Sequence, residues 1–582
     1  MSEPMFAISE RLEGELKECT SFESTTIPTR FGRVHNSSFC HAASFELTSS
    51  SIMVAFWEFF VTLVLEVVLF SWSRTVRFCF WLWFWFTQQK SERLPPIRQQ
   101  LLLRSASELA AEIREGKVKS VDLVHAYIDR SLAVQGALNA IVEDRFEAAL
   151  QEASEADRLV RSGTLSPEQL ERQRPLLGVP FTAKNSIGIS GLVQDAGSAY
   201  YAGQRADQDA AVVALLRQAG AIPLALTNVP ELCAWGDSHN RLRGSTRNPY
   251  DTRRSPGGSS GGEGALIAAA GSLMGIGTDL VGSIRIPSAF CGIYGHKPTA
   301  GIVSNGGVFP AWPEHMAQYN CTGPMCRFVD DLALMLKAMA GSNAAQLRLD
   351  KKVDVRDLRI YYVEDEGATV LSRVDREARQ ALQKVVKFLQ ESHGVTPVLL
   401  RLAELRNLYP FWLTACASSN GADLGDIFKH GQEKMNPMKE ALLTLVGRCK
   451  HSPAVVLLSW LTSLAYFRSE KRQAHFASTV SGLRQRLEDL LGSDGVLLLP
   501  SNATSAPYHH QDLGFCETFG MTCIFNFLGF PSTACPVAFD AQGLPLGVQV
   551  AAARGQDRLC LALASEIDQG FGGWKQPWPS RT

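Results

Sequence analysis

Three regions with different patterns of hydrophobic and polar residues follow one another along the chain. Residues 1–51 are rich in Ser and Thr and show no sustained apolar periodicity, which is typical of a disordered leader. Residues 52–70 are almost wholly apolar, with three polar interruptions. From residue 94 onwards, apolar positions recur with helical and strand spacing. The pattern therefore predicts one large folded domain over 94–582.

The apolar run is long enough to form a membrane anchor. Its nineteen residues, 52–70, would cross the hydrocarbon core of a bilayer as a helix. A second, aromatic run over 78–86 is too short to span but suits the interfacial zone. Glu58 and Glu66 count against a simple span, since an ionised carboxylate at the bilayer centre costs roughly 3 kcal/mol. The sequence predicts an anchor over 52–93 and leaves spanning and monotopic insertion open.

Basic residues lie unevenly around the apolar run. Four Lys or Arg residues lie between positions 74 and 93, whereas Arg33 is the nearest one before the run, so the positive-inside rule places the following domain in the cytosol. The thirteen cysteines include no C-x-x-C pair and indicate free thiols in a reducing compartment. We expect attachment to the endoplasmic reticulum or to lipid droplets, with a cytosolic catalytic domain.

The folded region has the alternation of an α/β protein. Residues 105–135 have helical spacing with Ser107 as a candidate cap. A net charge of -1 argues against a nucleic-acid partner, which normally requires a basic face. Short apolar runs predict buried strands between helices. These runs are 177–183, 222–226 and 496–500.

Two glycine- and serine-rich stretches, 255–264 and 275–287, concentrate the candidate chemistry. Glycine lets the backbone approach a substrate closely. The Gly-Gly-Ser-Ser-Gly core of the first stretch fits the nucleophile elbow of an α/β-hydrolase, with Ser259 as the nucleophile. However, a polar loop over 251–256 precedes it where an elbow needs a strand. A phosphate loop is disfavoured because Glu263 stands where its lysine belongs.

Three elements together form a more specific pattern: Lys184 at the end of a predicted strand, Ser259 in the first stretch, and Ser283 in the second. This combination resembles the amidase signature family, which carries a lysine, then G-G-S-S-G-G, then G-x-G-T-D-x-G-G-S-I-R-x-P. The resemblance extends over about 95–582, and within the family it is strongest to the fatty-acid amide hydrolases. It implies an α/β fold in which a large single domain has a mixed twisted sheet covered by helices on both faces.

The resemblance also implies roles for individual residues. Lys184, desolvated by apolar neighbours, would be the base; Ser259, following a cis peptide bond, would relay the proton; and Ser283 would attack the amide carbonyl to give an acyl-enzyme. No metal or cofactor is implied. Backbone N–H groups would hold the oxyanion. These belong to Leu280, Val281, Gly282 and Ser283, with Ser260, Asp279 and Arg285 supporting the loops.

One position departs from the family pattern. The family nearly always has glycine where this chain has Val281. A β-branched side chain is penalised at positive φ and narrows the space beside the acyl carbon. Two functions therefore stay open: an active amidase, and a catalytically weak or inactive membrane-bound paralogue that binds lipids or partners.

The apolar features indicate the substrate class. Two short apolar helical patterns within 436–467 are separated by a polar, partly basic segment, 447–453. In fatty-acid amide hydrolases a comparable region forms a membrane-facing cap, although core helices would give the same pattern. The expected substrates are fatty-acid primary amides and N-acylethanolamines, and the expected partner is a lipid bilayer. A small or peptide-like amide substrate and a homodimer stay open.

Overall fold

The structure is a computed structural model that describes residues 90–365, 374–417, 424–428, 435–511 and 520–578, with a few positions between 71 and 82. The chain divides after Thr62, and all described residues belong to the second unit, Leu63–Thr582. The predicted leader and most of the predicted anchor therefore lie outside the described residues. Within the ranges above, no helix combines the length and the apolar character that crossing a bilayer requires.

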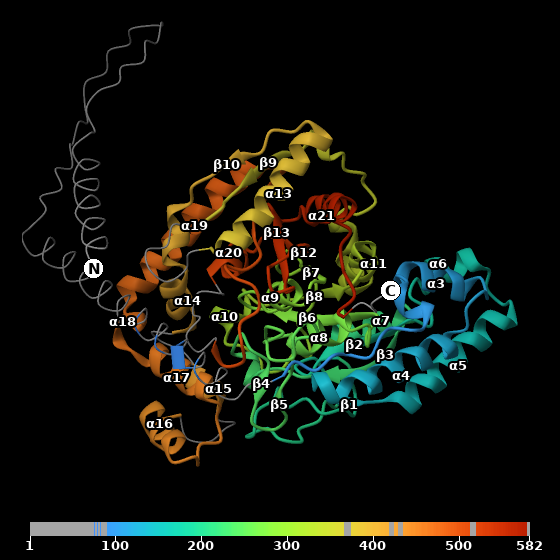
Figure 1. Ribbon diagram of the computed structural model, residues 1–582, viewed down its shortest axis with the longest axis horizontal. Coiled ribbons are helices and arrows are strands. Elements are labelled where there is room, and N and C mark those ends of the chain that lie inside the picture. Colours follow the sequence, from blue (N-terminus) through green and yellow to red (C-terminus); the bar gives the residue numbers. More distant parts are fainter. Residues whose placement is uncertain are drawn as a thin grey trace, which may run out of the picture. The chain divides into compact units, whose positions relative to one another are not determined.

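The centre of the described domain is an eleven-stranded sheet in the order β1-β3-β2-β6-β8-β7-β12-β13-β11-β9-β10 (Figure 1). Pairing is parallel from β3 through β2 to β6 and again from β11 through β9 to β10, and antiparallel elsewhere. This mixed sheet, flanked by helices, confirms the predicted α/β class. The strands are β1 (Ile141–Asp144), β2 (Pro180–Lys184), β3 (Ile222–Thr227), β6 (Met274–Asp279), β7 (Tyr294–Lys297), β8 (Cys321–Cys326), β9 (Arg359–Tyr362), β10 (Val398–Leu399), β11 (Gly495–Pro500), β12 (Ser532–Phe539) and β13 (Pro545–Ala552), with a separate hairpin of β4 (His239–Asn240) and β5 (Gly244–Ser245).

Helices connect the strands and cover the sheet. The α-helices are α3 (Ala106–Arg114), α4 (Ser120–Leu138), α5 (Phe146–Ser162), α6 (Pro167–Gln173), α7 (Ala211–Gln218), α8 (Gly261–Ala268), α9 (Arg285–Phe290), α10 (Glu314–Ala317), α11 (Val329–Ala340), α12 (Ala344–Leu347), α13 (Arg376–His393), α14 (Leu408–Cys416), α15 (Leu424–Phe428), α16 (Pro437–Leu445), α17 (Pro453–Ser463), α18 (Ala465–Arg468), α19 (Glu470–Leu491), α20 (Gly520–Leu528) and α21 (Asp557–Phe571). Short 3-10 turns are η1 (Gln100–Leu103), η2 (Glu231–Cys233), η3 (Gly341–Asn343), η4 (Val355–Asp357) and η5 (Ala403–Asn407).

Strand β11 shows that the sheet is buried on both faces. Its side chains alternate between two apolar clusters, because successive residues of a strand point to opposite faces. Val496 and Leu498 belong to one cluster. Leu497 and Leu499 belong to the other. A strand that is apolar at every position, as this one is, is typical of a sheet covered on both sides.

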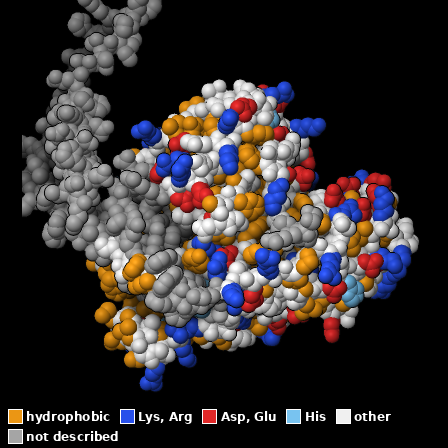
Figure 2. All heavy atoms as spheres, in the orientation of Figure 1, with side chains coloured by type: hydrophobic (Ala, Val, Ile, Leu, Met, Phe, Trp, Pro, Cys, Tyr) orange, Lys and Arg blue, Asp and Glu red, His pale blue; other side chains and the backbone are white. Residues whose placement is uncertain are grey.

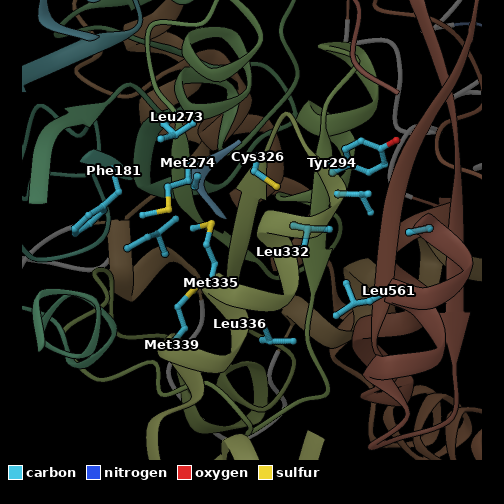
Figure 3. Close-up of a cluster of buried hydrophobic side chains, with 14 of the residues drawn as sticks. Phe181, Leu273, Met274, Tyr294, Cys326, Leu332, Met335, Leu336, Met339 and Leu561 are labelled. Atoms are coloured by element: carbon cyan, nitrogen blue, oxygen red, sulfur yellow. The ribbon is translucent and has the colours of Figure 1, made fainter. Parts of the chain in front are cut away.

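The larger of the two clusters includes residues of α11 and of strands β2 and β6. In Figure 3, Met335 and Met339 of α11 point toward the strands that carry Phe181 and Met274. All of these side chains are fully buried. This cluster fixes strands β2 and β6, which end at the site described below.

The helical pattern predicted over 105–135 forms two helices, α3 and α4. Helix α3 ends before Gly116, which has φ of 73°, and α4 begins at Ser120. The cap of α3 is Ser105 rather than Ser107, since the Ser105 hydroxyl accepts from the N–H of Glu108. The Ser107 hydroxyl instead donates to Asp331 at 2.8 Å.

Other expectations for the folded region are confirmed. The three apolar runs predicted as strands overlap β2, β3 and β11, each of which extends one residue beyond its run. The apolar patterns within 436–467 form α16 and α17, each with a proline in its first turn. The ten cysteines that the structure describes are all free thiols.

Candidate active site

The three predicted catalytic residues lie at the ends of neighbouring elements. Lys184 is the last residue of β2, which pairs in parallel with β6. Ser283 follows β6, and Ser259 lies just before α8. Because parallel strands end at the same edge of a sheet, the lysine and the loop after β6 come together there.

The Lys184 side chain is fully buried and bonded to the first serine. Its Nζ donates to Ser259 Oγ at 2.6 Å and to Thr278 Oγ1 at 2.8 Å. Burial lowers the pKa of Lys184 below the ordinary 10.5, although nearby Cys233 and Asp279 oppose the change. The neutral amine, which can accept a proton, is therefore favoured more than in an exposed lysine.

A backbone hydrogen bond connects the loop that carries Ser259 with the loop that carries Ser283. The peptide bond between Gly258 and Ser259 is cis, as the family resemblance implied. The N–H of Ser260 donates to the Ser283 carbonyl at 3.2 Å. This hydrogen bond links the loop of Ser260 to the loop of Ser283, and the supporting role of Ser260 stays a prediction.

The loop over 280–283 presents backbone donors beside Ser283. Among the hydrogen bonds of the described residues, none is donated by the N–H groups of Leu280, Val281 or Ser283, although all three residues are buried. Gly282 differs, because its N–H donates to Asp279 Oδ1 at 2.7 Å. Three of the four predicted oxyanion donors are therefore available in this structure, and the fourth orders the loop.

Asp279 and Arg285 form the support beneath this loop. Arg285 donates to both carboxylate oxygens of Asp279, at 3.0 and 3.1 Å, and both side chains are fully buried. Burial alone would raise the pKa of Asp279, but the charge and hydrogen bonds of Arg285, together with Lys297 and Asn526, outweigh burial and lower the pKa to about 2. Asn526 and Gln549, which the sequence did not single out, accept from Arg285 at 2.7 and 3.0 Å.

Val281 is accommodated by the backbone. It is not among the described residues with positive φ, whereas Gly282 has φ of 130°. A side chain at Gly282 would also collide with Thr522. The position that requires glycine is therefore Gly282, and the Val281 carbonyl accepts from the Thr522 hydroxyl at 2.5 Å.

Ser283 is one of the residues that line an apolar pocket. Side chains from segments far apart in the sequence form its walls, so no local pattern revealed them. Thr278, in contrast, stands inside the G-T-D motif and could have been found there. The residues that line the pocket are Cys233, Ala234, Trp235, Leu280, Val281, Ser283, Trp312, Tyr409, Trp412, Leu424 and Leu458.

This arrangement agrees with the comparison to known proteins. The family model described as Amidase matches residues 122–561, which is most of the folded domain. The chain belongs to the amidase family. As a member of this family, it is an amide hydrolase. Membership of the amidase family argues against the alternative of an α/β-hydrolase with Ser259 as nucleophile.

Two relatives of this amidase share most of its length. Fatty-acid amide hydrolase 2-A of Danio rerio is 43% identical over 492 residues, covering 83% of this chain and 92% of that protein. Fatty-acid amide hydrolase 2 of Homo sapiens is 41% identical with the same coverage. A solved structure of fatty acid amide hydrolase has a TM-score of 0.67 at 23% identity, covering 83% of this chain and 87% of that one, which shows the shared fold.

Proposed function

We propose that this amidase is a membrane-bound serine hydrolase that cleaves fatty-acid amides, including primary amides and N-acylethanolamines, through an acyl-enzyme. The observation that carries the proposal is the 2.6 Å contact between buried Lys184 and Ser259, next to a loop whose Ser283 opens onto an apolar pocket. A base, a relay and a nucleophile are thereby available in one place.

Acylation begins at the lysine. Neutral Lys184 accepts the Ser259 proton while Ser259 Oγ accepts the proton of Ser283. Ser283 Oγ then forms a bond to the amide carbonyl carbon, and the negative charge moves to the carbonyl oxygen. Collapse of this intermediate breaks the carbon–nitrogen bond, and the proton returns through Ser259 to the leaving amine.

The free amides of the 280–283 loop suit the charged intermediate. The N–H groups of Leu280, Val281 and Ser283 have no acceptor among the described residues and lie in a buried loop. Fixed donors in a site of low dielectric stabilise a developing oxyanion more than water does. Water then attacks the acyl-enzyme by the same route in reverse, releasing the fatty acid and restoring Ser283.

The pocket supports an acyl substrate. Apart from Ser283, its walls consist of aliphatic and aromatic side chains and one thiol. Burial of each methylene group of a chain contributes about 0.8 kcal/mol, so such walls favour long acyl groups over short or charged ones. This supports the fatty-acid amides that the names of the relatives indicate.

The helix pair α16–α17 supports membrane binding. Met438, Leu442 and Leu445 recur at helical spacing and are 62%, 64% and 83% exposed. Figure 2 shows hydrophobic side chains at the lower left, where Figure 1 places α16. Lys439 and Arg448 nearby are also exposed, and an apolar face with basic neighbours is typical of interfacial helices.

The predicted anchor extends this proposal to location. An anchor over 52–93 together with the exposed face of α16 would hold the domain at one membrane surface. We propose the cytosolic face of the endoplasmic reticulum or of lipid droplets, from the basic residues after the apolar run and the free cysteines.

A panel of fatty-acid primary amides and N-acylethanolamines tests the nucleophile. Ser283→Ala is expected to lower turnover by more than about a thousandfold, because the acyl-enzyme can no longer form. Ser304→Ala, at an exposed serine outside the site, is the matched control and should leave turnover unchanged. Equal turnover by Ser283→Ala and the unsubstituted enzyme would refute the assignment.

Val281 lines the pocket and is the one observation that favours the weak or inactive alternative. A serine-reactive fluorophosphonate probe separates the two functions. The active enzyme is expected to be labelled at Ser283. Absence of labelling that Val281→Gly restores would favour the inactive paralogue instead.

A further inference from the structure

One wall of the pocket is a short segment that we name the pocket strap, residues 231–237. Cys233, Ala234 and Trp235 of this strap line the pocket that Ser283 opens onto. On the same pocket, Leu458 comes from α17 of the proposed membrane-facing pair. The strap and α17 thus shape one cavity from different parts of the chain.

The first residue of the strap, Glu231, accepts hydrogen bonds from the two residues that precede α17. The carboxylate of Glu231 accepts from His451 Nδ1 at 2.8 Å and from the N–H of Ser452 at 2.6 Å. Ser452 is the cap of α17. His451 and Glu231 are both buried, so this contact is shielded from water.

The His451 ring fits tightly at this place. It lies against the ring of Tyr200, with 4.5 Å between the ring centroids. Its backbone carbonyl accepts from Arg241 Nε at 2.6 Å. Its side chain therefore has a defined position, and Glu231 meets a fixed partner rather than a mobile one.

The last residue of the strap, Asp237, accepts a hydrogen bond from Ser255, at the start of the glycine-rich stretch that contains Ser259. Asp237 Oδ1 accepts from the Ser255 hydroxyl at 2.6 Å, and Ser255 Oγ accepts from the N–H of Gly257 at 3.0 Å. His509 Nδ1 lies 3.6 Å from Asp237 Oδ2. Each end of the strap thus has a buried carboxylate beside a histidine from a distant segment.

The backbone of the strap needs these outside contacts. Leu232 and Cys233 both have positive φ, 50° and 58°. Consecutive residues with side chains are disfavoured in this left-handed region and persist only where surrounding contacts hold them. Bonds at Glu231 and Asp237 supply such contacts.

We infer that Glu231 and His451 are positioning residues that set the pocket wall for long acyl chains. The inference deepens the proposed function and rests on it, because the wall is argued to contact a fatty acyl chain. The Glu231–His451 hydrogen bond fixes the position of the strap relative to α17. If this bond is lost, the distance between Trp235 and Leu458 across the pocket is no longer fixed. A long chain that reaches both is then bound less well, whereas a short acyl group beside Ser283 is not affected.

The experiment compares palmitamide with butyramide in detergent micelles. For His451→Leu we expect the ratio of kcat/KM for palmitamide to that for butyramide to fall about tenfold, mainly through KM, the range typical of altered apolar pocket contacts. His451→Asn, whose amide can donate from the place of Nδ1, is expected to restore the ratio to within about threefold of the unsubstituted value. Glu231→Gln, which keeps the shape of the side chain, provides a second measurement if His451→Leu does not fold.

A matched buried pair serves as control. His296 Nε2 lies 3.2 Å from Asp557 Oδ1, and both residues are fully buried and do not line the pocket. His296→Asn is therefore expected to change kcat/KM by the same factor for palmitamide and for butyramide. The inference would be overturned if kcat/KM fell by the same factor for both amides in His451→Leu and in Glu231→Gln, or if it fell for neither amide. Failure of the unsubstituted enzyme to hydrolyse palmitamide would refute the proposed function instead, so the two failures are distinguishable.

Discussion

The Lys184 amine must be neutral before it can accept a proton, and burial favours that state by lowering its pKa. We expect kcat/KM for butyramide to rise with pH as Lys184 loses its proton, with the midpoint below the ordinary lysine pKa of 10.5. Lys184→Ala should lower the rate by about a hundredfold or more and remove this rise. Lys337→Ala, at an exposed lysine, is the control. An unchanged pH profile in Lys184→Ala would contradict the role of Lys184 as the base.

Glu263 predicts a pH dependence of stability. It is fully buried, and burial raises its pKa to about 8 against the hydrogen bonds that it accepts from Thr182 and Thr227. The folded state therefore keeps a proton that the unfolded state loses above the ordinary pKa of 4.5. The stability from this group is full below 4.5 and is lost as pH rises toward 8.

Substitution of Glu263 tests this sign. Glu263→Gln cannot ionise, so its midpoint of thermal unfolding should rise relative to that of the unsubstituted enzyme as the pH is raised from 5 to 8. Differential scanning calorimetry at both pH values measures the change. A difference between the two proteins that is constant with pH would contradict the raised pKa.

Individual site residues could be predicted only where they stand inside a motif. Lys184, Ser259 and Ser283 were found together because the family pattern fixes their order. The engagement of the Gly282 N–H with Asp279 was not predictable, since it depends on how the loop turns. The tolerance of Val281 likewise required its backbone angles.

At the scale of elements, α16 supplies a testable surface. Each exposed leucine that inserts into a membrane contributes about 1.5 kcal/mol or more. Leu442→Ser combined with Leu445→Ser is therefore expected to weaken binding to phospholipid vesicles at least about tenfold, measured by co-sedimentation. Hydrolysis of micellar butyramide should not change.

Leu132→Ser is the matched control for that surface, because Leu132 is 60% exposed on a different helix, α4. It should leave vesicle binding intact. Equal sedimentation of the α16 variant and the unsubstituted chain would contradict a membrane role for α16.

Elements were predictable where apolar periodicity is strong, as for α16 and α17. The helical spacing predicted over 105–135 did not reveal the break between α3 and α4, because the periodicity continues across Gly116, where the backbone leaves the helix. The capping box between Ser105 and Glu108 was a usable signal for the true start of α3.

At the scale of the whole molecule, we expect the amidase domain to work without the preceding chain. The chain is in contact with the folded domain from residue 92, because the N–H of Glu92 donates to Thr252 Oγ1 at 2.7 Å. A chain lacking residues 1–89 is expected to keep its kcat/KM for butyramide within about threefold, because its core is complete, but to sediment less with vesicles. An unchanged sedimented fraction would contradict the anchor.

The α/β class could be predicted from the sequence, but the strand order could not. Strand β11 pairs with β9, although more than a hundred residues separate them, and no local pattern encodes that partnership. The strand order depends on how the apolar faces of all the strands and helices are buried together.

The aromatic lining of the pocket has an optical consequence. Trp235, Trp312 and Trp412 lie on the pocket wall, so three of the eleven indoles in the sequence share the space that an acyl chain would fill. Displacement of water from their rings changes their fluorescence emission. The enzyme therefore carries its own spectroscopic reporter of occupancy, with which stopped-flow measurements on Ser283→Ala can separate the binding of an amide from its cleavage.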